Sequence, residues 1–488
     1  MSAPLLDSAL LLLLAYSAGL VGLGLWIGRR VGTTGDFFVA GRRLGPGLLF
    51  TTLLAANIGA GSTVGAAGLG YRDGLSAWWW VGSAGIGTAL LAVWVGPRIW
   101  RIARDRELLT VGDWLELRYG PSVRAAIAGL LWLATIAILA GQLIAAAWVL
   151  NVVAGLPKWA GCLAAGTVMT VYFTAGGLLT SAWVNLVELA VLLAGFALAL
   201  PFALGTAGGW QAVVASAPAS NPDWLSFTHG GASGWTYVFL LVPAFIVSPG
   251  LLQKVYGARS ASAVRTGGLL CAAALLLFAF LPPVLGMTAR SIAPALPNPE
   301  LALPTVLLEG LPLALGVLAL AAVFSAEISS ADAILFMLAT SLSEDLWRRF
   351  LRPEASDREV LRTARIAAVA GGGLGVGLAL ALPSVIGALA IFYTLLSVSL
   401  FVPLVAGLHT RRPGPVEALA AAGGGIAVVV AARWSGMPAT GLASPYTLGL
   451  AASALAFLLA FAVNRGRTRG VPSPAGPPRP DPPPPGPR

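Results

Sequence analysis

Two carboxylates and two adjacent hydroxyls interrupt a long apolar stretch in the second half of the chain. The interruption is the heptapeptide AEISSAD at 326–332, whose polar members are Glu327, Ser329, Ser330 and Asp332. Ionisable groups at membrane depth are costly unless they are paired, hydrated or bound to a metal ion, so such a cluster indicates a functional site. The alternative interpretation is a polar contact between two helices, which serine residues often provide.

The composition indicates that this cluster lies in a membrane protein. Of the 488 residues, 57% are hydrophobic and 10% are charged, and the mean hydropathy is +0.84. These values exclude a soluble protein. The sequence contains about thirteen apolar runs, each long enough to cross a hydrocarbon core of ~30 Å. We predict helical spans near residues 7–28, 48–68, 76–97, 123–153, 158–175, 182–204, 235–256, 266–287, 304–340, 363–383, 386–408, 415–433 and 446–463.

The distribution of basic residues predicts the orientation. No basic residue precedes the first run, and Arg29 and Arg30 follow it, which predicts a transmembrane helix rather than a signal peptide. We therefore expect the N-terminus outside and the C-terminus in the cytoplasm. The net charge of +10 then reflects the positive-inside rule and contact with anionic lipid, not binding to nucleic acid. We expect a multi-pass protein of the cell membrane, with a bacterial inner membrane as the expected compartment.

Few other residues point to chemistry. Cys162 and Cys271 both fall in apolar runs, so we expect no disulfide framework. We expect no cofactor other than a coupling ion. The Pro-rich segment 466–488 is predicted to be a disordered cytoplasmic tail.

Two of the predicted spans are interrupted in their middle. One has Asn57, Ser62 and Thr63 among clustered glycines, and the other contains Ser248 followed by Pro249. Irregular backbone at membrane depth persists only where it is buried in protein or lines a watery cavity. A pair of interrupted helices five spans apart is typical of a secondary transporter with inverted repeats and a site at the membrane midplane. Close helix packing through glycine is the alternative, but it does not explain Asn57 or Pro249.

The chain resembles the sodium:solute symporter family, which includes sodium-coupled sugar, proline, sialic acid, pantothenate and choline carriers. The resemblance covers roughly residues 30–410. The segments that carry it are Asp36–Arg42, Ala55–Ile58, Leu109–Gly120, Thr174–Leu179 with Trp183–Asn185, and Gln253–Lys254 with Ala258–Ser260. It implies a leucine-transporter-type fold with two inverted five-helix repeats, at 48–205 and 235–409. An extra helix at 1–30 and two more at 415–465 would be additions to this core.

The resemblance also implies a sodium site between the first broken helix and the helix that carries the polar cluster. Its ligands would be the backbone carbonyls of Ala55, Ile58 and Ala326 and the hydroxyls of Ser329 and Ser330. Residues 326, 329 and 330 are spaced i, i+3 and i+4, so they share one face of a helix. Neutral hydroxyls and carbonyls suit a monovalent ion, whereas a calcium site would gather more carboxylates.

Four residues near this implied site are candidates for coupling. Asn185 stands where many members of the family carry an aspartate, and Glu188 lies one helical turn beyond it. Asp332 follows the serine pair as it does in the choline branch, and Glu327 is unusual for the family. We expect Asp332 to compensate for the missing carboxylate or to bind a cationic substrate.

The substrate is expected to lie between the two helix breaks. The candidate residues for this pocket are Asn57, Ser62, Thr63, Ser248, Pro249 and Trp78. Trp78 could stack on a cation or a ring, or could belong with its two neighbours to an interfacial aromatic belt. A sugar is disfavoured because Ser62 stands where the sugar carriers have a glutamine. An amino acid, a carboxylate and a quaternary amine all stay open.

These observations predict sodium-coupled uptake of a small organic solute by alternating access. The main alternative is a proton-coupled carrier that uses Asp332 or Glu327. A membrane-embedded enzyme is disfavoured because no nucleophile–base or metal constellation is visible. The expected partners are the solute, Na⁺ and the lipid bilayer, and the oligomeric state stays open.

Overall fold

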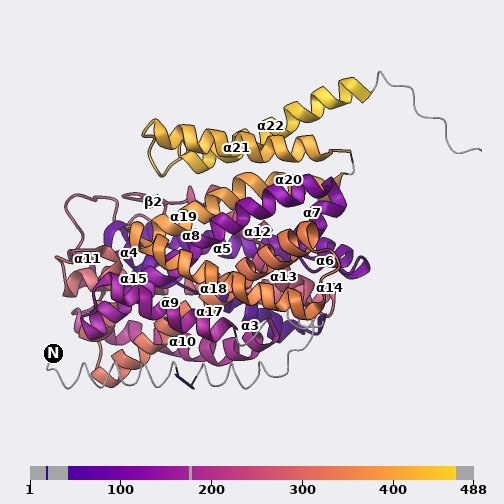
Figure 1. Cartoon of the computed structure of the whole chain (residues 1–488). Helices are drawn as coiled ribbons and strands as arrows, with labels where there is room; N and C mark the ends of the chain where they lie inside the picture. The colour runs from indigo at the N-terminus through magenta and orange to yellow at the C-terminus, as the bar shows by residue number, and fades with distance from the viewer. Residues whose placement is uncertain (1–17, 20–41, 175–177, 411, 469–488) are drawn as a thin grey trace, which may run out of the picture.

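The computed structural model describes residues 18–19, 42–174, 178–410 and 412–468 (Figure 1). Within these ranges, the side chains of residues 172–188, 325, 329, 332 and 465–468 lie outside the described part. The predicted first span at 7–28 and the Pro-rich tail from 469 onward also lie outside it.

The described chain is a bundle of helices with one two-stranded hairpin. The elements are α3 (Pro46–Asn57), η2 (Gly61–Gly65), α4 (Ala66–Asp73), η3 (Gly74–Ala77), α5 (Trp78–Leu90), η4 (Leu91–Val95), α6 (Gly96–Asp105), α7 (Val111–Tyr119), α8 (Pro121–Ala154), α9 (Lys158–Thr174), α10 (Leu178–Thr206), α11 (Trp210–Ala215), β1 (His229–Gly230), β2 (Ser233–Gly234), α12 (Tyr237–Val247), α13 (Pro249–Tyr256), α14 (Ala261–Phe278), α15 (Leu281–Ile292), η5 (Pro299–Leu301), α16 (Ala302–Glu309), α17 (Leu313–Thr340), η6 (Ser341–Leu351), α18 (Asp357–Ala381), α19 (Val385–Leu396), η7 (Ser397–Phe401), α20 (Val402–His409), α21 (Pro415–Trp434) and α22 (Pro445–Thr468).

Ten helical stretches in the described part of the chain are long and apolar enough to cross a membrane. This supports a polytopic all-α membrane protein, while the predicted number of spans stays a prediction.

One predicted span is wrong in its extent. The run at 304–340 is divided, because α16 ends before Gly310 and α17 begins after Pro312. Proline lacks a backbone N–H and suits the start of a helix, and Pro312 stands at the N-cap of α17.

Both predicted interruptions are present in the structure. The first separates α3 from η2 at Ile58–Ala60, and the second separates α12 from α13 at Ser248. The long helix α17 packs against α3, α8 and α10, so it faces the first interruption. In Figure 1, α21 and α22 lie together along one side of the bundle, away from α10 and α17.

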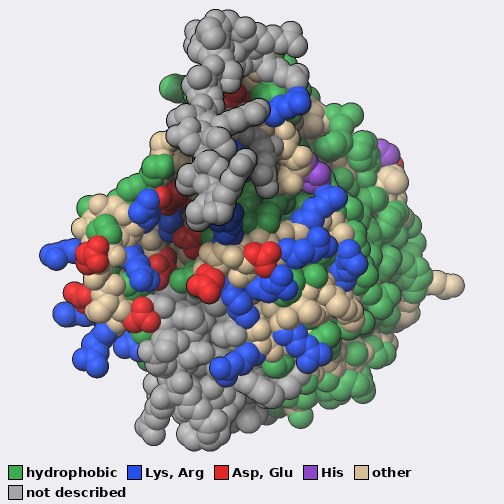
Figure 2. Space-filling model, turned by 90° about the vertical axis from the view of Figure 1, so that its right-hand side faces the viewer, with side chains coloured by type: hydrophobic (Ala, Val, Ile, Leu, Met, Phe, Trp, Pro, Cys, Tyr) green, Lys and Arg blue, Asp and Glu red, His purple; other side chains and the backbone are tan. Residues whose placement is uncertain are grey.

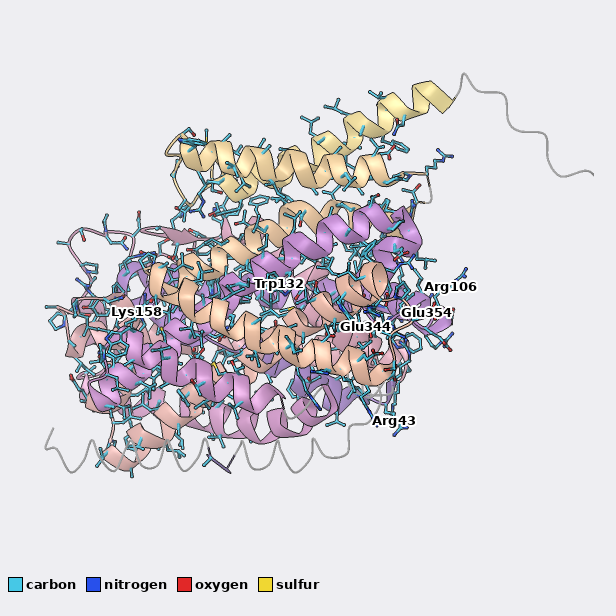
Figure 3. All side chains as sticks on the ribbon, viewed as in Figure 1. Arg43, Arg106, Trp132, Lys158, Glu344 and Glu354 are labelled. Carbon is cyan, nitrogen blue, oxygen red and sulfur yellow. The ribbon has the colours of Figure 1, made fainter. Side chains whose placement is uncertain are left out.

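Charged side chains gather at one end of the bundle. We call this end, which carries Arg98, Arg104, Arg106, Arg118 and Arg349, the basic end. Figure 2 views it directly and shows many basic side chains, with acidic ones among them, beside a largely hydrophobic flank. In Figure 3, Arg106 and Glu344 lie toward this end and Lys158 lies at the opposite one.

The basic end is held together by a buried arginine on the first turn of α8. The Arg124 side chain is only 6% exposed, and its Nη1 lies 2.9 Å from Asp113 Oδ1 and 3.0 Å from Glu116 Oε2. Its Nη2 lies 2.9 Å from Asp345 Oδ1. Asp113 and Glu116 belong to α7, and Asp345 belongs to η6. One guanidinium therefore joins three separate elements.

Two further contacts extend this network. The Thr110 hydroxyl donates a hydrogen bond to the Asp345 carboxylate, and Arg349 pairs with Glu116. Burial works to raise the pKa of Glu116, but hydrogen bonds from Arg349 and Arg124 hold its pKa below the ordinary value. Glu116 is therefore ionised at neutral pH and balances the two arginines.

A second buried carboxylate links elements toward the other end. Glu300 Oε1 accepts a hydrogen bond from the Val385 amide at the start of α19 (2.7 Å), and Oε2 accepts one from the Trp148 indole (3.1 Å). Burial raises the pKa of Glu300, in opposition to these hydrogen bonds. The short segment η5 is thus fastened to α8 and α19.

The network at Arg124 generates a stability prediction. Removing one partner of a buried ion pair leaves an uncompensated charge, which typically costs about 3–5 kcal/mol. We expect Arg124→Gln to lower the thermal unfolding midpoint of the purified protein markedly. Arg104→Gln is the control, because Arg104 is 55% exposed where it pairs with Asp105 and exposed pairs contribute little. Equal midpoints for the two variants would contradict this role of Arg124.

Candidate functional site

The first interruption leaves two backbone carbonyls without helical partners. In a continuous helix the Gly59 N–H would donate to the Ala55 carbonyl, but here it donates to Ser62 Oγ (2.9 Å). The Ser62 N–H would likewise donate to the Ile58 carbonyl, but it donates to the Gly59 carbonyl instead (2.9 Å). The carbonyl oxygens of Ala55 and Ile58 are therefore available to another group.

Ser330 on α17 is that group. Its hydroxyl oxygen lies 3.2 Å from the Ala55 carbonyl oxygen and 3.0 Å from that of Ile58. A hydroxyl carries one proton, so it cannot satisfy both carbonyls fully. Three oxygens thus converge at membrane depth with lone pairs left over, which is an arrangement suited to a hard monovalent cation.

The structure describes only some of the other residues of the predicted sodium site. Ala326 is buried one helical turn before Ser330 on α17, as the i, i+4 spacing predicts. The side chain of Ser329 lies outside the described residues, as do those of Asn185, Glu188 and Asp332. The structure therefore brings together Ala55, Ile58 and Ser330 from the predicted set, and leaves the contacts of the Ser329 hydroxyl undescribed.

A third helix reaches the interruption through Gln142 on α8. Its Oε1 accepts a hydrogen bond from the Ala60 N–H at 2.8 Å. A Cβ added to Gly59 would lie 2.2 Å from Ser330 Oγ and 2.8 Å from Gln142 Oε1. Only glycine fits where the broken helix, α8 and α17 approach so closely. The lone amide of Gln142 in a long apolar run was a usable signal that our sequence reasoning missed.

Glu327, the residue after Ala326 on α17, also contacts the broken helix. The fully buried carboxylate accepts a hydrogen bond from the Thr63 hydroxyl at Oε1, with a distance of 2.7 Å. Its other oxygen, Oε2, is buried and has no hydrogen-bond partner among the described residues. Thr63 and Glu327 are thus brought together, although nothing in their sequence positions predicted this contact.

A cavity of about 60 Å³, which we call the midplane cavity, lies between the two interruptions. Of the predicted substrate residues, Asn57, Ser62 and Ser248 line it, and Ser330 lines it as well. The cavity therefore borders the convergence of Ser330 with the freed carbonyls.

Three other predicted substrate residues lie elsewhere. Thr63 contacts Glu327, and Pro249 lines a neighbouring cavity. Trp78 packs against Trp79 and Phe227, with ring centroids 5.2 and 5.1 Å apart.

Aromatic side chains form much of the cavity wall. Tyr393 on α19 is their centre, since its ring lies 6.1 Å from Trp80, 5.3 Å from Phe245 and 5.3 Å from Phe392. All four residues line the cavity. Sequence reasoning missed them because single aromatic residues in apolar runs are ordinary core residues.

The described lining of the cavity contains no charged side chain. The polar groups that remain are hydroxyls and amides, among them the Tyr393 hydroxyl and the Gln142 amide. Among the described residues, therefore, no Lys, Arg or His stands at the wall to pair with an anionic solute.

A smaller cavity of about 30 Å³ continues toward the basic end. It is lined by Gln253, Pro249, Thr110 and Asp345, and it shares Met337 with the midplane cavity. The network around Arg124 thus closes the floor of this cavity, because Thr110 and Asp345 belong to both.

The fold is similar to that of solved transporters. A sodium-coupled sialic acid symporter in a substrate-bound outward-open state aligns with a TM-score of 0.76 and 17% identity, over 95% of this chain and 97% of that one. Mhp1, a nucleobase-cation-symport-1 family transporter, aligns with a TM-score of 0.58 and 15% identity, over 90% and 97% of the two chains. These similarities support the predicted leucine-transporter-type fold.

The sequence comparisons agree with the fold. A sodium/pantothenate symporter of Escherichia coli is 29% identical over 441 residues, covering 84% of this chain and 87% of the relative. A sodium/glucose cotransporter of Vibrio parahaemolyticus is 26% identical over 72% of this chain and 71% of its own. A high-affinity choline transporter of Drosophila melanogaster is 26% identical over 80% of this chain and 65% of its own. The model of the sodium:solute symporter family matches residues 37–421. The chain therefore belongs to the sodium:solute symporter family.

Proposed function

We propose that this protein is a secondary transporter that couples the inward movement of Na⁺ to the uptake of a small organic solute. The observation that carries the proposal is the convergence of Ser330 with the freed carbonyls of Ala55 and Ile58. These oxygens, with the Ala326 carbonyl and the Ser329 hydroxyl, form the Na⁺ site. Such a ligand set is neutral and consists of oxygens only, which fits a monovalent hard cation.

Coupling follows from the position of this site between two elements. One half belongs to the broken helix at α3 and the other half belongs to α17, so bound Na⁺ holds the two elements together. Ser330 also lines the midplane cavity. A cation that binds one conformation better shifts the population toward it, and a solute that prefers the same conformation is then bound more tightly.

The free energy available from one Na⁺ is sufficient for uptake. A tenfold gradient supplies about 1.4 kcal/mol, and a potential of 100 mV adds about 2.3 kcal/mol per charge. The sum of about 3.7 kcal/mol supports roughly 500-fold accumulation of a neutral solute.

The basic end faces the cytoplasm in this proposal, because Arg and Lys accumulate on the cytoplasmic side of membrane proteins. The smaller cavity above Asp345 and Thr110 is then part of the exit path. The ion network at Arg124 closes this path in the conformation described.

The cavity wall supports a solute that carries no net negative charge. Aromatic faces attract cations, and the described lining offers no basic side chain to an anion. Among the classes that the sequence left open, this favours a quaternary amine over a carboxylate. The choline transporter among the relatives is consistent with this class.

The Na⁺ site generates one prediction. Ser330→Ala removes one of about five ligand oxygens, and we expect the Na⁺ concentration for half-maximal uptake to rise at least about tenfold, which corresponds to ~1.4 kcal/mol. The measurement is solute uptake into proteoliposomes at varied external Na⁺. Ser399→Ala is the matched control, because Ser399 is equally buried but its hydroxyl only bonds the Leu395 carbonyl of its own helical segment. An unchanged Na⁺ requirement in Ser330→Ala would refute the assignment.

The aromatic wall of the cavity generates a second prediction, which concerns the solute. Trp80→Leu removes an aromatic face, so we expect the KM of a quaternary amine such as choline to rise by about 2- to 30-fold, with little change in the Na⁺ requirement. Trp79→Leu is the control, since Trp79 lies outside the cavity and its indole bonds the Phe227 carbonyl. Uptake of carboxylates but not of amines by the wild-type protein would show that the solute class is wrong.

A further inference from the structure

Glu327 is a buried carboxylate for which the Na⁺ site proposed above has no assigned use. It follows Ala326 directly on α17, it is 0% exposed, and no described residue forms a hydrogen bond with its Oε2. Among the described side chains, none forms an ion pair with it. A carboxylate in such surroundings is unfavourable as a lone anion, because it has lost its hydration without gaining a counter-charge.

The proposed Na⁺ site has the opposite deficiency. Its ligands are carbonyls and hydroxyls, which are all neutral, so a bound Na⁺ would bring an uncompensated positive charge to membrane depth. A buried cation and a buried anion close to each other compensate this cost mutually, because their attraction is strong where the dielectric constant is low.

The geometry places the two groups on the same face of α17. Glu327 and Ser330 are three residues apart, so their side chains project from one side of the helix. Both contact the first broken helix, Ser330 at the carbonyls of Ala55 and Ile58 and Glu327 at the Thr63 hydroxyl.

Thr63 connects the carboxylate to the interruption itself. Its hydroxyl oxygen lies 2.7 Å from Glu327 Oε1 and 2.9 Å from the Gly59 carbonyl oxygen. Gly59 in turn lies so close to Ser330 that a Cβ on it would fall 2.2 Å from Ser330 Oγ. Glu327, Thr63, Gly59 and Ser330 therefore form one continuous set of contacts around the break.

We propose that Glu327 supplies the negative charge that balances the coupling cation, and that Thr63 orients its carboxylate toward the break. The inference rests on the Na⁺ site proposed above and adds to it a charged residue that the neutral ligand set lacks. In this role Glu327 does not coordinate the cation but balances its charge. The oxygens that coordinate the cation remain those of the carbonyls and serines.

The test measures Na⁺ binding through thermal stability, independently of transport. The purified protein in detergent is heated at constant pH while Na⁺ replaces K⁺ at constant ionic strength. The unfolding midpoint is recorded for the wild type, Glu327→Gln, Glu327→Asp, Thr63→Val and Ser330→Ala. Ligands that bind only the folded state raise this midpoint, so the response to Na⁺ reports affinity.

Three results are expected together. Glu327→Gln needs at least about tenfold more Na⁺ for the same stabilisation, because the attraction between the two charges is lost, while Glu327→Asp is intermediate. Thr63→Val keeps the charge and shifts the Na⁺ response by only about two- to fivefold. In the absence of Na⁺, Glu327→Gln is at least as stable as the wild type, because a buried carboxyl group without a counter-charge among the described side chains has been removed.

The stability of Glu327→Gln in the absence of Na⁺ separates charge balance from a structural role. A Glu327→Gln protein that is less stable without Na⁺ and keeps its Na⁺ affinity would overturn the inference, since Glu327 would then serve packing only. A normal Na⁺ response in Glu327→Gln and a lost one in Ser330→Ala would overturn the inference and leave the proposed function intact. No Na⁺ response in the wild type would overturn both.

Discussion

The interruption of one transmembrane helix is the constraint on which the rest of the site depends. Because Gly59 and Ser62 direct their amides away from the usual acceptors, the carbonyls of Ala55 and Ile58 stand without helical partners at membrane depth. Unpaired backbone carbonyls cannot face lipid, so the interruption must be enclosed by protein and must be given something to bind. The placement of α17 and α8 around it, and the requirement for glycine at position 59, follow from that need.

The two ends of the bundle complement this centre. At the basic end, Arg124 joins α7, α8 and η6 beneath the smaller cavity. Toward the other end, Glu300 fastens η5 to α8 and α19. Alternating access requires such contacts to break and form in turn while the central site persists. These charged contacts thus lie toward the two ends of the bundle, and the described wall of the midplane cavity is uncharged.

Much of this arrangement could be predicted from the sequence, because broken helices and buried polar residues are rare in apolar runs. The sequence therefore allowed us to predict the break at Ile58–Ala60, the break at Ser248, and the helical face shared by Ala326 and Ser330. The aromatic wall could not be predicted, since Tyr393 resembles any core residue until α19 is placed beside α8 and α12. The choice of Trp80 over Trp78 depends on the rotation of α5, which tertiary packing decides. The span at 304–340 was misjudged because hydropathy alone does not register the division at Pro312.

The most direct test of the account is solute uptake into proteoliposomes whose Na⁺ and H⁺ gradients are imposed separately. The account predicts that an inward Na⁺ gradient alone drives accumulation of a quaternary amine, and that collapsing this gradient abolishes it. Accumulation that is indifferent to Na⁺ and follows an imposed H⁺ gradient would contradict the central claim that Na⁺ at the helix break powers transport.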